Sequence, residues 1–540
     1  MMKFPQTWAA RLAHKIRQTK RLSKKSIALL FLLAGSALVA LTALMFAYLA
    51  DLALEWNALL VGKYPWFAWV ALPLGLPLLA WFTRKFAPYT SGSGIPQVIA
   101  SLSLPYGAQK TRLIRLGETF FKIPLTFLGM ILGASIGREG PSVQVGAAVM
   151  NAWGAWCKKH GLAFRGMQEN DLIAAGAAGG LAAAFNAPLA GVVFAIEELG
   201  RGVILRWERQ ILMGVLAAGF IQVAIQGNNP YFSGFQGHEL PNMLMWAAVS
   251  GIVCGVAGGL FGSFLYRGAA AFAPVRWRSF IRRHLLVVAF VMGILLALLG
   301  TFYQGKTYGT GYHEAAAALK GAYEAPIGLA AAKWAATVFS YWAGIPGGIF
   351  TPSLTIGAMI GEHMASFAQL GDASNVAVLL CMAAFLAAAT QSPLTAAVVV
   401  MEMTGGQNLL FWMLLTCIFA SQVSRQFSPH PFYHAAGLRF RRHIEAESGH
   451  VPHEKRIARH TKGRLKIDFR RPFVCRLKLY CGLFKQQNQQ QHNRNHTQPQ
   501  TLALLHFDQM YIGIAHFLLA VFINQRIDFA RQGRDDLRPV

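Results

Sequence analysis

Long runs of hydrophobic residues dominate the chain and predict membrane-spanning helices. The first uncharged run covers residues 26–50, which is long enough to cross a hydrocarbon layer of about 30 Å. A secretory signal peptide has a shorter apolar region that ends in a cleavage site of small residues, so we interpret this run as a retained first helix. Further apolar blocks lie at residues 65–82, 119–136, 172–196, 210–225, 243–265, 285–302, 327–346, 376–401 and 409–423.

Two charged residues interrupt this apolar pattern. Residues 137–141 read Gly-Arg-Glu-Gly-Pro, and neither the preceding residues 123–136 nor the following residues 142–156 carry a charge. An ionisable side chain at the centre of a membrane helix costs about 3 kcal/mol, so such a residue indicates a functional site. The glycines and the proline break the helix here and leave backbone N–H groups free. Together with Arg138 and Glu139, these donors predict a pathway for an anion.

The composition supports a membrane protein and disfavours an enzyme. The chain of 540 residues is 54% hydrophobic and 14% charged, which is typical of an all-α polytopic membrane protein. The six cysteines show no metal-ligand spacing, so we expect no metal site and no cofactor. No Asp lies in the cores of the apolar blocks and no HExxH motif occurs, so a membrane-embedded hydrolase is disfavoured.

The net charge of +27 is concentrated at the two ends of the chain. Basic residues fill residues 1–25, and a second basic cluster follows the last apolar block from Arg439 onward. Basic residues that flank membrane helices mark the cytoplasmic side, so we expect both termini in the cytoplasm, contact with anionic lipid and no nucleic-acid partner. Residues 441–540 are basic and polar with little apolar periodicity, which predicts a largely disordered tail.

The apolar region repeats itself. Residues 133–147 align with residues 344–358 through their glycines, proline, serine and alanine, and residues 182–189 align with 387–394 in the same way. Corresponding Gly- and Pro-broken helices in two halves of inverted topology indicate a transporter site at the interface between the repeats. We therefore expect a transmembrane domain over residues 26–440, with halves at about 26–225 and 240–440.

Four other charged residues in or beside the apolar blocks receive structural interpretations. Glu197 and Glu402 each follow a repeated Pro-Leu pair, and we expect Glu402 to cap a helix or to pair structurally. Lys122 lies four residues after Glu118, a spacing that places both on one helical face. We expect this pair to support a positive vestibule and not to bind the ion directly.

Four short motifs give the chain a resemblance to a known family. Residues 92–96, 137–141, 348–352 and Tyr433 resemble, in order, the four signatures of the CLC chloride channel and transporter family. The resemblance implies helix N-termini from both halves that meet at an anion site near the bilayer midplane, and a homodimer in which each subunit has its own pore. With no recognisable nucleotide-binding pair after Tyr433, it implies a bacterial inner-membrane member.

The resemblance also implies the residues that bind the anion. The hydroxyl groups of Ser93 and Tyr433 and the backbone N–H groups of Ile349 and Phe350 are expected to donate hydrogen bonds to chloride. Backbone donors suit an ion that must also leave, because a fixed ammonium would bind it too tightly. The residues expected to support this site through the motif backbone are Gly92, Gly94, Pro96, Gly137, Arg138, Gly140, Pro141, Gly348 and Pro352.

Two glutamates carry the predicted coupling to protons. By resemblance, Glu139 is the gate: its carboxylate competes with chloride when ionised and moves aside when protonated. Glu198 matches the position from which exchangers of the family pass protons to the gate. With both residues present, we predict chloride/proton antiport; the alternative is a voltage- or pH-gated chloride channel without proton coupling.

Overall fold

The computed structural model describes residues 6–447, except residues 106, 161–167, 202–208, 238 and 322, and describes only the backbone of residues 6–28, 108, 209, 210 and 372. Within these residues every regular element is a helix, and the only extended pairings are two isolated bridges. The predicted all-helical class is therefore confirmed.

Contacts divide the chain into the units Met1–Val451 and Pro452–Val540. The second unit lies outside the described residues, so the disorder expected for most of the tail stays a prediction. The first residues assigned to that tail are helical, because the last helix, α21 (Phe432–Glu447), continues through residue 447.

Five helices in the described part of the chain are long and apolar enough to cross a membrane: Leu29–Lys63 within α1 (Gln6–Lys63), α2 (Phe67–Phe86), α11 (Met243–Arg267), α14 (Leu285–Phe302) and Gln407–Phe427, which joins η4 (Gln407–Leu409) to α20 (Leu410–Phe427). Each coincides with an apolar block of the sequence. The remaining blocks form shorter helices, as the interruptions by Gly and Pro indicate.

The structure splits two predicted blocks at corresponding places in the repeat. Asn186 and Gln391 adopt positive φ angles of 53° and 59°, a left-handed conformation that ends a helix. A proline then opens the next helix in both halves, where its missing N–H costs nothing. The helices on either side of the breaks are α8 (Glu169–Phe185) and α9 (Pro188–Phe194) in the first half, and α18 (Ser374–Thr390) and α19 (Pro393–Thr404) in the second.

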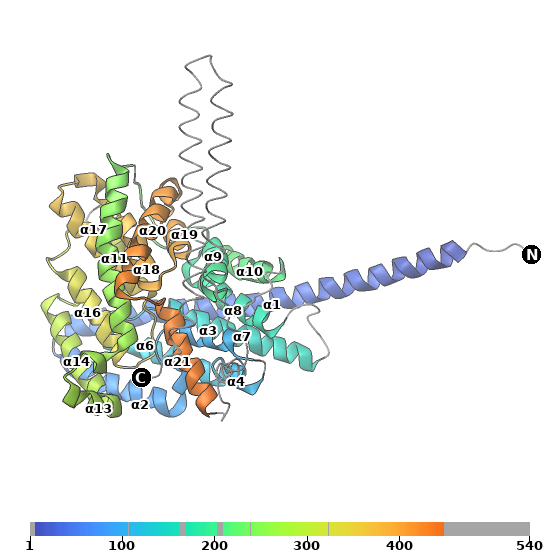
Figure 1. The fold of residues 1–540 in the computed structure, drawn as a ribbon, viewed down its shortest axis with the longest axis horizontal. Helices are drawn as coiled ribbons and strands as arrows, with labels where there is room; N and C mark the ends of the chain where they lie inside the picture. Colours follow the sequence, from blue (N-terminus) through green and yellow to red (C-terminus); the bar gives the residue numbers. More distant parts are fainter. Residues whose placement is uncertain are drawn as a thin grey trace, which may run out of the picture. The chain divides into compact units, whose positions relative to one another are not determined.

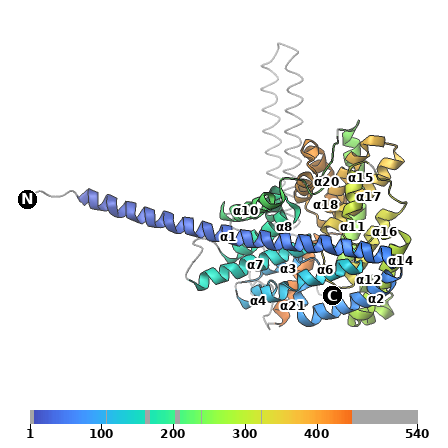
Figure 2. The ribbon, with the colours of Figure 1, turned by 180° about the vertical axis from the view of Figure 1, so that it is seen from behind.

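The two halves pack in the same order, as the predicted repeat requires. In the first half α8 packs against α7, α10 and α1, and in the second half α18 packs against α17, α20 and α11. Both views show α11, α18 and α20 side by side (Figures 1 and 2).

The bounds of the remaining elements are α3 Ile95–Ser103, α4 Ala108–Arg112, α5 Leu116–Thr119, α6 Lys122–Leu132, α7 Glu139–Lys159, α10 Arg209–Gln226, α12 Ala269–Phe272, α13 Val275–Arg283, α15 Tyr312–Leu319, α16 Leu329–Trp342, α17 Phe350–Phe367, η1 Pro88–Thr90, η2 Ala195–Leu199 and η3 Gly371–Ala373.

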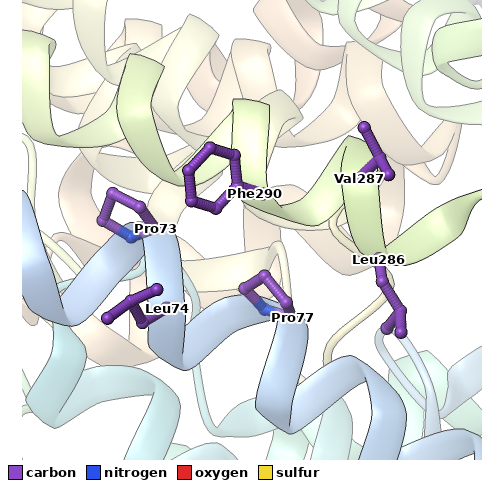
Figure 3. A pocket seen from close by; sticks show the side chains of 6 residues that line it. All are labelled: Pro73, Leu74, Pro77, Leu286, Val287 and Phe290. Atoms are coloured by element: carbon purple, nitrogen blue, oxygen red, sulfur yellow. The ribbon is translucent and has the colours of Figure 1, made fainter.

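A groove between α2 and α14 shows the apolar side of the domain (Figure 3). Its lining contains only apolar side chains: Pro73, Leu74, Pro77, Leu286, Val287 and Phe290. A surface without hydrogen-bonding side chains suits hydrocarbon and offers nothing to an ion. The candidate ion site therefore lies elsewhere, where the glycine-rich motifs meet.

Candidate anion and proton site

The three glycine-rich motifs come together through their backbones. Gly137 and Gly348, which are repeat mates, exchange two hydrogen bonds: the N–H of Gly137 donates to the carbonyl of Gly348 over 2.7 Å, and the reverse bond measures 2.6 Å. The bridge is antiparallel, as expected for repeat mates in inverted orientation. Gly92 joins them, because its N–H donates to the Ile345 carbonyl over 3.0 Å and its carbonyl accepts from Gly347 over 3.1 Å.

Close approach at this junction requires glycine at two positions. A Cβ on Gly140 would meet the hydroxyl and the carbonyl oxygen of Ser93. A Cβ on Gly348 would lie 3.0 Å from the Gly137 carbonyl oxygen and 3.1 Å from the Gly140 nitrogen. The absence of side chains thus lets all three motifs share one small volume.

Four helices begin at or beside the motifs. Their first residues are Ile95 in α3, Glu139 in α7, Phe350 in α17 and Phe432 in α21. The first four N–H groups of an α-helix have no acceptor within the helix, and the helix dipole is positive at this end. Ile349 is the N-cap residue of α17, so the two predicted backbone donors lie at one such helix start.

The two hydroxyl groups predicted to bind the anion lie near each other. Ser93 and Tyr433 are both buried, and the two side chains lie close enough to act on each other as hydrogen-bonding groups. Within the described residues neither hydroxyl makes a hydrogen bond of standard geometry. A buried polar group without a partner costs about 1–3 kcal/mol, so these two hydroxyl groups are suited to a ligand.

Glu139 has the most unusual surroundings of the predicted residues. It is the first residue of α7 and its side chain is 0% exposed. Its carboxylate lies against Gly137 and the start of α17, next to Thr351 and Pro352. In the part of the chain that the structure describes, the donors nearest its oxygens are the Thr351 side chain and the backbone N–H groups of Glu139 and Thr351, and none of them makes a hydrogen bond of standard geometry. The carboxylate therefore stands where the two halves meet.

Arg138 is held away from the Glu139 carboxylate by other partners. Its guanidinium lies 3.4 Å from both carboxylate oxygens of Asp51, on α1, and 6.0 Å from the centre of the Tyr231 ring. Arg138 thus ties the start of α7 to α1.

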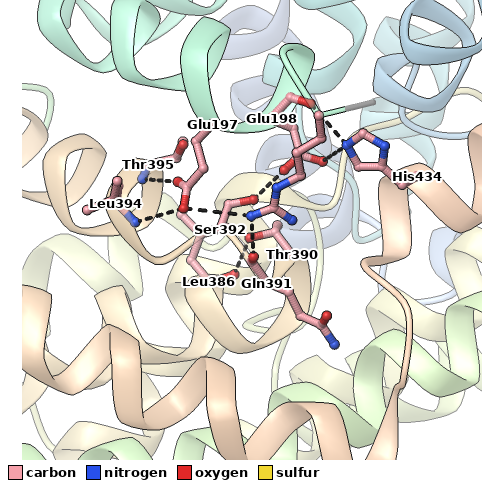
Figure 4. Close-up of polar contacts among 10 residues, drawn as sticks. Glu197, Glu198, Leu386, Thr390, Gln391, Ser392, Leu394, Thr395 and His434 are labelled. Atoms are coloured by element: carbon pink, nitrogen blue, oxygen red, sulfur yellow. Dashed lines mark hydrogen bonds and ion pairs between the residues drawn. The ribbon is translucent and has the colours of Figure 1, made fainter. Parts of the chain in front are cut away.

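Glu198 forms the second buried acid of the site (Figure 4). It lies in η2 with its side chain 1% exposed. The Ser392 hydroxyl donates to Oε2, and Nε2 of His434 lies 3.0 Å from the Glu198 carbonyl oxygen and 3.6 Å from Oε1. Among the described residues Oε1 has no hydrogen-bond partner. Glu198 is therefore a buried acid of the first half that contacts two residues of the second half.

The neighbouring Glu197 and its repeat mate Glu402 cap helices across the interface between the halves. Glu197 accepts from the N–H of Thr395 over 2.6 Å, at the start of α19, and Glu402 accepts from the N–H of Ala190 over 2.6 Å, at the start of α9. Each also accepts a second, longer bond from the preceding residue, Leu394 or Leu189. The capping expected for Glu402 is therefore present, and the two caps are reciprocal.

Removal of one cap should loosen this interface. Glu402→Ala leaves the N–H groups of Leu189 and Ala190 without their acceptor, at a cost of about 1–3 kcal/mol. We expect a lower temperature of aggregation in detergent, measured by size-exclusion chromatography after heating. The exposed Glu55 of α1 offers the control Glu55→Ala. Equal temperatures for the two variants would contradict the capping role.

The predicted pair between Glu118 and Lys122 is wrong. Glu118 lies in α5, which ends at Thr119, and Lys122 opens α6, so the two residues do not share a helical face. Lys122 is buried and donates instead to the side-chain oxygen of Gln144 on α7, over 2.8 Å. The side-chain nitrogen of Lys122 lies beside Gly94, which places a hydrogen-bond donor behind the first motif.

Sequence reasoning missed two residues that contact Glu198. Ser392 stands in the break between α18 and α19, and the repeat alignment shows this break but not which side chain faces the glutamate. His434 follows Tyr433 directly, and that adjacency was the available signal. Within the described residues no group of three or more His, Cys, Asp and Glu side chains is placed to hold a metal ion.

The family model described as "Voltage gated chloride channel" matches residues 75–425 of this chain. The chain belongs to the voltage-gated chloride channel family. The match includes every predicted site residue except Tyr433, which lies beyond it. The expectation drawn from the four motifs is therefore confirmed at the level of the family.

Relatives of this voltage-gated chloride channel family member include named exchangers. The chain is 30% identical over 391 residues to the H(+)/Cl(−) exchange transporter ClcA of Cronobacter sakazakii, a match that covers 69% of this chain and 80% of the relative. It is 28% identical over 383 residues to the protein of the same name from Yersinia pestis, with 67% of this chain and 75% of the relative covered.

Solved structures of the family share the fold. A slow cyanobacterial Cl−/H+ antiporter superposes with a TM-score of 0.63 at 27% identity, over 77% of this chain and 98% of the other. A eukaryotic CLC transporter gives a TM-score of 0.60 at 23% identity, over 76% and 74%; this second likeness concerns the fold alone. The two-half architecture predicted from the repeat is thus the architecture of the family.

Proposed function

We propose that this chain exchanges chloride for protons across a bacterial inner membrane. The observation that carries the proposal is the Glu139 carboxylate, which is fully buried at the junction of α7 and α17, beside the Thr351 side chain and the backbone N–H groups of Glu139 and Thr351. A buried carboxylate is costly in its ionised form and much less so when it is protonated, so a carboxyl group at this place is suited to take up and release a proton. The relatives named as exchangers support the same function.

The anion is held by donors without a full positive charge. In this proposal the hydroxyl groups of Ser93 and Tyr433 and the N–H groups of Ile349 and Phe350 bind chloride. The positive end of α17 adds a field that favours an anion. The motif glycines contribute by letting the backbones of the two halves approach each other. Because the donors are neutral, chloride can leave as readily as it enters.

Glu139 couples chloride to protons by taking the place of the ion. As a carboxylate it accepts from the same helix N-termini that bind chloride, so the two anions compete. As a neutral acid it loses this attraction and moves aside. Each cycle of binding and release then moves a proton in one direction and chloride in the other. Glu198, the second buried acid, supplies the protons from the cytoplasmic side.

The alternative function is a voltage- or pH-gated chloride channel without proton coupling. Chloride flux from proteoliposomes, with the external pH recorded at the same time, distinguishes the two. We expect the pH of the medium to change while chloride leaves the vesicles. The proton movement that causes this change should end when chloride efflux ends. Chloride efflux at constant pH would overturn the exchange proposal and leave the channel.

A substitution at Glu198 separates proton supply from anion binding. Glu198→Gln keeps an oxygen that can accept the Ser392 hydrogen bond but cannot carry a proton. We expect proton flux to fall on the order of 100-fold, the usual contribution of a positioned proton-transfer group, while chloride still moves. The same proteoliposome assay measures both. Equal losses in the two fluxes would show that Glu198 has a structural role only.

The proposal also covers catalytic activity, cofactors, orientation, domain bounds and the oligomeric state. We expect no catalytic activity and no cofactor, both termini in the cytoplasm, and a transmembrane domain over residues 26–440 between a basic N-terminus and a basic tail.

We also expect a homodimer. The repeat mates Leu189 and Leu394, beside the two caps, are exposed apolar side chains that a second copy would cover. Subunit counting in lipid vesicles tests the dimer, and accessibility of terminal tags tests the orientation.

A further inference from the structure

Among the described residues, one side chain that contacts Glu198 is itself partly exposed to water. The Glu198 side chain is 1% exposed, whereas the His434 side chain that faces it is 20% exposed. The Ser392 hydroxyl donates a hydrogen bond to Oε2 of the carboxylate. Oε1 has no hydrogen-bond partner within the described residues, and Nε2 of His434 lies 3.6 Å from it. The histidine thus contacts both the solvent and the free oxygen of the buried acid (Figure 4).

We propose that His434 is a proton-transfer residue that relays protons between the cytoplasm and Glu198. The proposal rests on the exchange function proposed above. The transfer conserves atoms and charge: Nδ1 takes a proton from water, and the Nε2 proton of the imidazolium passes to Oε1 of Glu198. A carboxylate and an imidazolium become a carboxylic acid and a neutral imidazole. Exchange of tautomers through water then restores the Nε2 proton, and the reverse sequence releases protons.

The position of the His434 imidazole favours proton transfer to Glu198. The contact between Nε2 and the Glu198 carbonyl oxygen, at 3.0 Å, fixes the ring edge that faces the glutamate. A small rotation of the carboxylate is enough to bring Oε1 from 3.6 Å to hydrogen-bond distance, because a transfer needs about 2.6–3.2 Å. His434 also follows Tyr433 on α21, so the proton relay and the anion site share one helix start.

The charged groups around the ring permit a change of protonation. Within the described residues, the ionisable groups that act on His434 are Glu198 and Arg201. Arg201 donates to the Gln391 carbonyl over 2.7 Å and lies 3.7 Å from Glu197. Arg201 is thus already partnered, and Glu198 is the acid nearest the ring. Histidine is the side chain that ordinarily changes charge between pH 5 and 8, which suits a relay that works in both directions.

Two substitutions at this position separate proton transfer from hydrogen bonding. His434→Gln keeps an N–H donor for the Glu198 carbonyl oxygen but cannot carry a proton, whereas His434→Ala removes both abilities. We expect both variants to lower the number of protons moved per chloride by about 100-fold, and both to weaken the dependence of the exchange rate on cytoplasmic-side pH between about 5 and 8. His443 of the same helix also lies 3.6 Å from a glutamate, Glu447, but is exposed, so His443→Gln is the control and should change neither quantity.

The outcomes distinguish the relay from other roles. Full coupling in His434→Gln with reduced coupling in His434→Ala would show that the ring only donates a hydrogen bond, and would overturn the relay. Equal loss of chloride and proton flux in both variants would show a purely structural role and overturn it as well. If the unmodified protein moved chloride without protons, the exchange function itself would fail, and the relay with it.

Discussion

Glu139→Gln should abolish proton transport while chloride continues to cross the membrane. Glutamine has nearly the shape of glutamate but neither the charge that competes with chloride nor the proton that the cycle carries. We expect proton flux to fall at least about 100-fold, to the level of protein-free vesicles. Chloride flux should persist, because the hydroxyl and backbone donors remain. Proteoliposome efflux with a pH electrode measures both quantities.

The position of Glu139 explains why this effect should exceed that of any neighbouring acid. Its carboxylate faces the start of α17 in the second half, beside Thr351 and Pro352. Asp51 makes the matched control: it pairs with Arg138 and is half or more exposed. Asp51→Asn should therefore keep proton coupling. Unchanged proton flux in Glu139→Gln would show that the gate lies elsewhere.

Gly348→Val should abolish both fluxes together. Even a Cβ at this position would lie 3.0–3.2 Å from the Gly137 carbonyl oxygen, the Gly140 nitrogen and Pro141 Cδ, and valine adds two methyl groups. Separation of the two backbones by overpacking costs about 3 kcal/mol, which corresponds to roughly 100-fold in anion affinity. Chloride and proton flux are measured in the same vesicles.

The control for this substitution is a glycine in open space. Gly62 in α1 has nothing within 4 Å of a Cβ, so Gly62→Val should transport at the rate of the unmodified protein. Folding of both variants is followed by size-exclusion chromatography. Transport by Gly348→Val at an unchanged rate would contradict the view that backbone contact between the halves builds the anion site.

Much of this arrangement could be predicted from the sequence because the repeat imposes it. Matching glycines and prolines required corresponding breaks, and the structure has them at Asn186 and Gln391. The same symmetry predicted a structural role for Glu402, which caps α9 while Glu197 caps α19. The meeting of Gly137 with Gly348 follows from the same relation, since repeat mates lie close together near a two-fold axis.

Hydropathy alone missed the helices that carry the site. α7 and α17 begin at the motifs and are almost wholly buried in protein along their first turns. A helix surrounded by other helices needs small residues for close packing and no lipophilic surface. Their Gly, Ser, Gln and Thr content therefore gave a weaker signal than the lipid-facing α14.

Side-chain partners that depend on tertiary packing could not be predicted from the sequence. Lys122 pairs with Gln144 because the chain turns between α5 and α6, and local spacing gives no sign of that turn. His434 contacts Glu198 across more than 200 residues of sequence, a contact that only the packing of α21 creates. Charge and spacing predict which residues are functional more reliably than they predict which residues touch.

The reversal potential of the current tests the exchange of chloride for protons most directly. The voltage at zero net current is measured across a planar bilayer, with the chloride gradient fixed and the pH gradient varied. An exchanger must shift this voltage as the pH gradient changes, because protons contribute to the driving force. A reversal potential that stays at the chloride equilibrium potential for every pH gradient would contradict the account and identify a channel.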